Sequence, residues 1–211
     1  MNSYLEDRKV RVRYASKEYI KVTNKGCIQG SIGGPTFWNI LLDPLLDELE
    51  RRGIYCQAFA DDIVLVFSGE SVTELERQAD QTLTYVEAWG IKNKLKFAVH
   101  KTSAMVVTKK LKFETPWIHM GEVEIQMVDQ IKMLGLIIDK KLTFQQHVSY
   151  VCTKATNIYK QLSSSENLLG AESGDKRTMY VAVVEPVISY AAGVWGEAAG
   201  KISIQKMLNA V

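Results

Sequence analysis

Two consecutive carboxylates, Asp61 and Asp62, stand between two short runs of β-prone residues, 57–60 and 63–67. This pattern predicts a β-hairpin that carries both acids at its tip. Adjacent negative charges repel each other unless solvent or a cation offsets the repulsion. Phosphoryl-transfer enzymes use such a hairpin to hold two Mg²⁺ ions, which activate a 3′ hydroxyl and stabilise the leaving pyrophosphate. The alternative is an acidic surface turn, because aspartate is common in turns.

A glycine-rich segment, residues 29–35, precedes the two acids, and an apolar stripe over residues 37–49 follows it. The pattern predicts a glycine loop that leads into a helix, with Pro44 kinking or dividing that helix. Missing side chains let a nucleotide or a template base approach the backbone, where Gln29 and Ser31 can hydrogen-bond it. A tight turn is the alternative for a glycine cluster taken alone. The spacing leaves one helix between the loop and the acids, which favours a common site.

Lysines spaced two apart, Lys92, Lys94 and Lys96, lie in a stretch without acidic residues. Within a predicted strand over residues 92–99 they would present three ammonium groups to a phosphate backbone. A solvated charged face is the alternative. Charge varies in blocks along the chain, with +4 over residues 1–30, −8 over 31–90, +7 over 91–113 and −1 over the remainder. An acidic centre bordered by basic walls could hold a polyanion.

The chain has 211 residues, of which 46% are hydrophobic and 24% charged, and its net charge is +2. This length and composition suffice for a globular core. The three cysteines are far apart and form no C-x-x-C pair, and the three histidines are dispersed, so neither a disulfide framework nor a zinc site is indicated. The first residues lack the apolar core of a secretory signal, and no apolar run reaches membrane-spanning length. We therefore expect an intracellular protein, of the nucleus or cytoplasm, with no membrane contact.

The hydrophobic pattern changes near residue 139. Residues 1–139 predict an α+β part, and residues 140–211 predict a helical region with a Ser- and Gly-rich break over 163–174 and a second helix at 179–190. Four tryptophans at patterned apolar positions are expected in the core, namely Trp38, Trp89, Trp117 and Trp195. Extended runs are expected at residues 10–14, 19–22, 92–99, 105–107, 117–120, 123–127 and 132–138.

Five motifs follow one another along the chain. They are Gly26-Cys27-Ile28-Gln29-Gly30-Ser31-Ile32-Gly33-Gly34-Pro35, Phe37-Trp38-Asn39, Phe59-Ala60-Asp61-Asp62, Lys101-Thr102 and Met133-Leu134-Gly135. Their order resembles that of reverse transcriptases of non-LTR (LINE-type) retrotransposons, especially arthropod ones. The match covers nearly the whole chain, and motifs in the right order carry more weight than any one of them alone.

The resemblance implies a right-hand polymerase fold. Residues 1–139 would form part of the palm, an antiparallel sheet with helices, and residues 140–211 a thumb-like helical region. Asp61 and Asp62 would hold the catalytic Mg²⁺ ions, which Mn²⁺ can replace. The other implied roles are nucleotide and template binding by Gln29, Gly30, Ser31 and Lys101, and a primer grip formed by Met133, Leu134 and Gly135. The alternatives are palm support or a solvated charge for Lys101, and a hairpin core for Leu134 and Gly135.

The implied reaction is the RNA-templated addition of deoxynucleotides to a DNA 3′ end. Its partners would be an RNA template, a DNA primer and dNTPs. The family places a third catalytic carboxylate and the fingers before the region matched here, so we expect an upstream segment of the same polyprotein to complete the site. We expect the chain to be inactive alone. Ile28 and Ala98 depart from the residues usual in the family. The alternative is a non-catalytic nucleic-acid-binding protein, or a remnant, derived from such an element.

Overall fold

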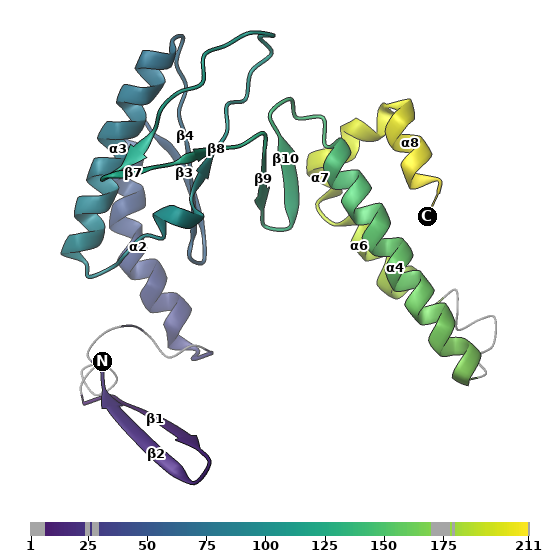
Figure 1. Cartoon of the computed structure of the whole chain (residues 1–211), viewed down its shortest axis with the longest axis horizontal. Helices are drawn as coiled ribbons and strands as arrows, with labels where there is room; N and C mark the ends of the chain where they lie inside the picture. The colour runs from purple at the N-terminus through teal and green to yellow at the C-terminus, as the bar shows by residue number, and fades with distance from the viewer. Residues whose placement is uncertain (1–6, 24–25, 27–29, 170–177, 179, 211) are drawn as a thin grey trace. The chain divides into compact units, whose positions relative to one another are not determined.

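The computed structural model describes residues 7–23, 26, 30–169, 178 and 180–210 (Figure 1). These residues form helices and small two-stranded sheets, which agrees with the expected α+β class. Contacts along the chain define two compact units, Met1–Leu95 and Lys96–Val211. The expected division between residues 139 and 140 concerns palm and thumb functions, and it stays a prediction.

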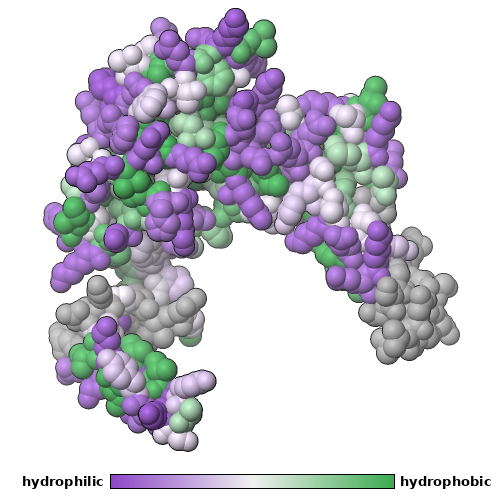
Figure 2. All heavy atoms as spheres, viewed as in Figure 1, coloured by the Kyte–Doolittle hydropathy of each residue, from purple (hydrophilic) through white to green (hydrophobic). Residues whose placement is uncertain are grey.

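The first unit begins with an antiparallel hairpin of β1 (Lys9–Tyr14) and β2 (Lys17–Val22). The extended runs expected here are confirmed. Ala15 and Ser16 form the turn, and both have positive φ, as a two-residue hairpin turn of the primed type requires. Every strand residue is exposed, and Figure 2 shows apolar side chains at the surface of this hairpin. Because a two-stranded hairpin with no covered face is only marginally stable, its strands contribute little to the stability of the unit.

Two long helices, α2 (Gly33–Arg51) and α3 (Val72–Lys92), supply the core of the first unit. Helix α2 runs without a break through Pro44, so the division of the helix considered from the sequence does not occur. Proline at this position leaves the carbonyl of Ile40 without its helical partner, and Ile40 is 60% exposed, where water can replace that partner. The buried apolar side chains of the two helices are Leu42, Leu45, Leu49, Ala79, Leu83, Val86 and Trp89.

Helix α2 ends in a glycine cap that turns the chain into the next strand. The amide of Gly53 donates to Glu50 O at 2.8 Å and that of Ile54 to Leu49 O at 3.0 Å, the two bonds of a Schellman motif. Gly53 has φ of +76°, a conformation that glycine adopts without strain. The chain then continues into β3 (Tyr55–Phe59), which pairs with β4 (Asp62–Val66).

Short strand pairs open the second unit. The strand β5 (Ser103–Ala104) pairs in parallel with β8 (Gln126–Met127), and β6 (His119–Met120) forms a hairpin with β7 (Val123–Glu124). A further hairpin joins β9 (Gln130–Met133) to β10 (Leu136–Asp139). The sequence predicts one strand over residues 132–138, which is wrong because a two-residue turn at Leu134 and Gly135 divides it.

Two other strand predictions are wrong. Residues 92–99 form the end of α3, a turn and an irregular segment, after which η1 (Val99–Lys101) is a short 3₁₀ helix. The strand expected at residues 105–107 lies two residues earlier, as β5. Strands of two residues are defined by their pairing partner, and Ser103 pairs with Gln126, so local residue pattern cannot locate them.

Helices form the rest of the second unit. They are α4 (Gln145–Leu169), the π-helical turn η2 (Tyr180–Val184), α6 (Glu185–Ser189), α7 (Ala192–Trp195), the 3₁₀ helix η3 (Gly196–Gly200) and α8 (Ile202–Leu208). The sequence predicts a break over residues 163–174. For residues 163–169 this prediction is wrong, because α4 continues to Leu169. The remainder of that break, residues 170–177, lies outside the described residues, as does residue 179.

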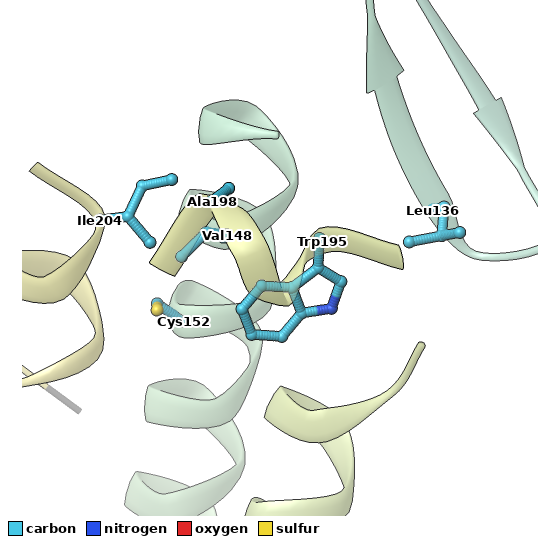
Figure 3. Packing of buried hydrophobic residues seen from close by; sticks show 6 residues of the cluster. All are labelled: Leu136, Val148, Cys152, Trp195, Ala198 and Ile204. Atoms are coloured by element: carbon cyan, nitrogen blue, oxygen red, sulfur yellow. The ribbon is translucent and has the colours of Figure 1, made fainter. Parts of the chain in front are cut away.

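The core of the second unit joins β10 to the helices. Figure 3 shows the indole of Trp195 packed among buried side chains from β10, α4, η3 and α8. Trp195 is 4% exposed and its Nε1 donates to Tyr190 O at 2.9 Å. The expectation of core tryptophans holds for Trp89 and Trp195, whereas Trp117 is 66% exposed. The labelled cluster consists of Leu136, Val148, Cys152, Trp195, Ala198 and Ile204.

The carboxylate of Asp139 connects β10 to the start of α4. It accepts the amides of Lys141, Thr143 and Phe144 and the hydroxyl of Thr143, at 2.7 to 3.1 Å. Partial burial raises the pKa of Asp139, but these hydrogen bonds outweigh it, so the pKa lies below its usual value.

Among the described helices, none has the length and apolar character needed to cross a membrane.

His147 makes the stability of the second unit sensitive to acid. It is fully buried, its Nδ1 accepts the Ile137 amide at 3.4 Å, and its Nε2 has no partner among the described residues. Burial lowers the pKa of His147. Near pH 6.5, the imidazole therefore binds a proton less readily in the folded state than in the unfolded state. The unfolded state thus binds more protons, and the free energy of unfolding decreases as pH falls through that value.

We predict that urea unfolding at pH 5.5 gives a lower free energy than at pH 7.5, and that this difference shrinks in His147→Gln. The pKa of Asp139 is below its usual value, so that group titrates outside this window. His119→Gln, at an exposed position, is the matched control and should keep the dependence of the parent chain. An unchanged dependence in His147→Gln would assign the effect to another group.

Candidate functional site

Asp61 and Asp62 lie at the tip of the β3–β4 hairpin, as predicted from the sequence. Phe59 pairs with Asp62, so Ala60 and Asp61 form a two-residue turn. Both aspartates are exposed, and neither carboxylate takes part in a hydrogen bond or ion pair with another described residue. The strand pairing fixes the backbone of the tip, while the carboxylate oxygens remain accessible to a cation.

Helix α2 holds this hairpin at two points. The indole N–H of Trp38 donates to the carbonyl of Ala60 in the turn. The thiol of Cys56 in β3 donates to Leu46 O at 3.7 Å. Burial and the nearby Glu50 carboxylate raise the pKa of Cys56, so its thiol keeps the proton that it donates. The helix that follows the glycine loop therefore positions the acidic turn directly.

The two carboxylates suit a hard divalent cation. Mg²⁺ prefers oxygen ligands and keeps several waters, so one or two protein carboxylates suffice to hold it. Within the described part of the chain, no three His, Cys, Asp or Glu side chains gather where they could hold a metal. A site for two ions would need at least one more ligand than Asp61 and Asp62.

The glycine loop is described from Gly30 onward, and Gln29 lies outside the described residues. Gly30 has φ of +79°, so the loop needs a glycine at this position. The hydroxyl of Ser31 accepts the amide of Gly34 at 3.0 Å and thereby helps to begin α2. The nucleotide- and template-binding roles of these residues stay predictions.

The three lysines do not share a strand face. Lys92 is the last residue of α3, Lys94 follows its C-cap, and Lys96 lies in the irregular segment of the second unit. The amide of Lys94 donates to Ile91 O at 3.1 Å and that of Leu95 to Gly90 O at 2.8 Å, which is again a Schellman motif. All three lysines are exposed, so phosphate contacts by each of them stay a prediction.

Met133, Leu134 and Gly135 occupy the tip of the β9–β10 hairpin. Leu134 and Gly135 have φ of +48° and +82° and form its two-residue turn. The hydroxyl of Tyr190 donates to Leu134 O at 2.8 Å across 56 residues of sequence. A Cβ added at Gly135 would lie 3.2 Å from the Tyr190 ring. Lys101 is exposed in η1, elsewhere in this unit.

A glycine loop, a helix and an acidic hairpin in this order are typical of template-directed nucleic-acid polymerases. A family model described as reverse transcriptase (RNA-dependent DNA polymerase) matches residues 1–138, and the chain belongs to this family. No solved structure matches the chain significantly.

Relatives among curated proteins come from insect retrotransposons. The chain is 29% identical to a putative 115 kDa protein in type-1 retrotransposable element R1DM of Drosophila melanogaster, over 98% of this chain and 20% of the relative. It is 31% identical to the probable RNA-directed DNA polymerase from transposon BS of the same species, over 94% of this chain and 23% of the relative. A Pol polyprotein from an R1 element of Nasonia vitripennis is 28% identical, over 82% of this chain and 43% of the relative. The expected resemblance to non-LTR elements is confirmed, and the chain spans less than half the length of each of these relatives.

Sequence reasoning missed the hydrogen bonds of Trp38 and Tyr190. Trp38 stands in an apolar stripe, so it was expected to serve as a core residue, and Tyr190 is distant from Leu134 in sequence. The available signal is chemical, because tryptophan and tyrosine carry a donor at the end of an apolar ring and place that donor at a partner.

The C-terminal ends of α2 and α3 allow a test in which glycine and lysine are exchanged, with opposite effects expected on the free energy of unfolding. Lys94 has φ of +57° at the position where α2 has Gly53. We predict that Lys94→Gly raises the free energy of unfolding by about 0.5–1 kcal/mol, because glycine removes the left-handed strain. Gly53→Lys is the matched control and should lower it by a similar amount, since no atom lies near enough to obstruct a Cβ there. Urea unfolding measures both, and a destabilised Lys94→Gly variant would contradict the strain argument.

Proposed function

We propose that the chain contributes to RNA-directed DNA synthesis by a non-LTR retrotransposon polymerase, with Asp61 and Asp62 in its catalytic metal site. The observation that carries the proposal is the exposed pair of carboxylates at the tip of the β3–β4 hairpin, inside the region that matches the reverse transcriptase family. Membership of this family supports a divalent cation as cofactor, and Mg²⁺ fits the two oxygen donors.

The bound ions would supply activation of the primer 3′ hydroxyl and neutralisation of the leaving pyrophosphate. Asp61 and Asp62 orient them, because the strand pairing and the Trp38 bond fix the backbone that carries both carboxylates. A third carboxylate from a preceding palm segment would complete the ligand set. The relatives are longer than this chain, which leaves room for such a segment and for the fingers in a complete polymerase.

Nucleic acid and nucleotide would contact three further groups of residues. Gln29, Gly30 and Ser31 would lie along the template and the incoming dNTP, and Lys101 near its phosphates. Met133, Leu134 and Gly135 would contact the primer backbone. Lys92, Lys94 and Lys96 are exposed and would each contribute a phosphate contact that does not depend on base sequence.

The direct test joins this chain to the preceding fingers and palm segment of a related R1 element. We expect the chimera to extend a DNA primer on an RNA template with Mg²⁺, and this chain alone to extend none. Asp61→Asn and Asp62→Asn should each reduce extension by about 100-fold or more, because each removes a metal ligand. Asp80→Asn, at an exposed position of α3, is the matched control and should leave extension unchanged.

One outcome would overturn the proposal. A folded chimera whose extension does not exceed that of Asp61→Asn would favour a non-catalytic nucleic-acid-binding protein. Extension by this chain alone that disappears in Asp61→Ala would overturn only the expected need for a third carboxylate.

The salt dependence of binding tests the lysines. We predict that changing Lys92, Lys94 and Lys96 together to glutamate flattens the plot of log affinity for an RNA·DNA hybrid against log salt by about 0.7–0.9 per lost phosphate contact. The control changes Lys109, Lys110 and Lys112, exposed lysines of the same acid-free stretch, and alters the net charge equally. Equal effects of the two variants would mean that only net charge matters, and an unchanged slope would mean that the first three lysines face solvent.

A further inference from the structure

Both turns assigned to the proposed function contain a residue that is unfavourable there. The first turn residue is Ala60 with φ of +52° in the acidic hairpin and Leu134 with φ of +48° in the β9–β10 hairpin. Turns of this kind favour glycine, asparagine or aspartate at positive φ, because a Cβ is strained there. Leu134 is 42% exposed, so burial offsets little of its strain. Residues in such conformations persist where the surrounding structure holds them.

In each turn, an aromatic side chain from a helical segment donates a hydrogen bond to the carbonyl of that same residue. Trp38 of α2 donates through its indole N–H to Ala60. Tyr190, which follows α6, donates through its hydroxyl to Leu134 at 2.8 Å. Each donor sits on a rigid ring with few rotatable bonds, so it fixes the direction of the carbonyl that it contacts.

The other hairpin turns lack this arrangement. Ala15 and Ser16 also have positive φ, with values of +45° and +64°, yet no side chain among the described residues donates to the carbonyl of Ala15. The β6–β7 turn begins with Gly121 at φ of +61°, which needs no such support. Among the described two-residue turns, the aromatic donor therefore accompanies the two that carry proposed site residues.

Tyr190 is itself held by the core. Its carbonyl accepts the indole N–H of Trp195 at 2.9 Å, and Trp195 is 4% exposed (Figure 3). The ring of Tyr190 also lies against Gly135, where an added Cβ would lie 3.2 Å from that ring. The packed helices of the second unit thus contact the turn through the Tyr190 side chain.

We propose that Trp38 and Tyr190 are positioning residues: Trp38 holds the acidic turn in the geometry that presents Asp61 and Asp62 to a cation, and Tyr190 holds the Leu134–Gly135 turn in the geometry that receives the primer strand. The inference rests on the proposed function for the use of the two turns. It adds that the helical region acts on the primer through Tyr190.

Tyr190→Phe tests the second half on this chain, because it removes the hydroxyl and keeps the ring. We expect amide hydrogen exchange at residues 134–136 to become about 3- to 10-fold faster, the equivalent of one lost hydrogen bond. Affinity for an RNA·DNA primer–template hybrid should fall by a similar factor, with an unchanged salt slope, because no phosphate contact is lost. The unfolding temperature should stay near that of the parent. Tyr159→Phe, at an exposed position of α4, is the matched control and should leave all four measurements unchanged.

A double-mutant cycle separates positioning from general weakening. Gly135→Ala places a Cβ 3.2 Å from the Tyr190 ring, so the ring must shift slightly, and it also strains the backbone at positive φ; it should therefore weaken hybrid binding more than Tyr190→Phe does. Combined with Tyr190→Phe it should cost little more than Gly135→Ala alone, if the shift of the ring already weakens the hydrogen bond of Tyr190 to the turn. Additive losses would mean that the two residues act independently and would overturn the positioning role.

Trp38→Phe tests the first half. Exchange at residues 60–62 should become faster, and the affinity for Mn²⁺ measured by electron paramagnetic resonance should fall about 3- to 10-fold. Trp117→Phe, at a position 66% exposed, is the control. Faster exchange at the turn with unchanged Mn²⁺ affinity would overturn the role of Trp38 and make its bond a folding contact.

Failure of the inference is distinguishable from failure of the proposed function. If the parent chain binds the hybrid and Tyr190→Phe binds it equally well, the positioning role of Tyr190 is wrong and the proposed function stands. If the parent binds neither hybrid nor Mn²⁺, the proposed use of both turns is wrong, and the positioning roles are overturned with it.

Discussion

Two adjacent negative charges cannot be buried in an apolar interior, and this constraint decides where the acidic hairpin turns. Removing an unpaired carboxylate from water costs far more than the roughly 1.5–3 kcal/mol that a buried aliphatic side chain contributes. Strand β4 is partly buried immediately after Asp62, at Ile63, Val64 and Leu65. The chain must therefore reverse between Phe59 and Asp62, and the register of β3 against β4 follows from that position. The arrangement leaves both carboxylates exposed next to a backbone that pairing and Trp38 hold in place.

In the second unit, buried polar groups constrain the packing, because each needs a hydrogen-bond partner. The indole of Trp195 and the Nδ1 atom of His147 are buried, and each meets a backbone partner, Tyr190 O and the Ile137 amide. These bonds connect β10, α4 and the later helices more specifically than apolar contacts can, because a buried donor or acceptor without a partner is costly. At one end of the β9–β10 hairpin, Asp139 binds the segment that leads into α4, and at the other end Tyr190 contacts the turn. The hairpin is therefore attached to the helices at both ends.

The sequence predicts the acidic hairpin, helix α2 and the helical region after residue 139, because each has a strong local pattern. The lysine segment misleads because side chains spaced two apart also occur where a helix ends and an irregular segment follows. A glycine after the C-cap would have marked that end, as Gly53 does for α2, but Lys94 stands there. The two-residue strands and the bond from Tyr190 to Leu134 depend on partners distant in sequence, which a local pattern cannot reveal. The assignment of the turns to metal and primer comes from family resemblance and not from periodicity.

The charge blocks along the sequence fall on identifiable elements of the structure, and the expected basic walls around an acidic centre stay a prediction. Much of the acidic excess before residue 90 lies on α2 and α3, and part of it is paired, since Asp47 and Glu48 form ion pairs with Arg51 and Arg52. The basic block continues from the first unit into the second. At the tip of the acidic hairpin, the carboxylates of Asp61 and Asp62 have no ion-pair partner among the described residues. Under the proposed function a divalent cation must offset their repulsion of phosphate before phosphate can approach. By linkage, nucleic acid would then strengthen cation binding by the same factor by which the cation strengthens nucleic-acid binding.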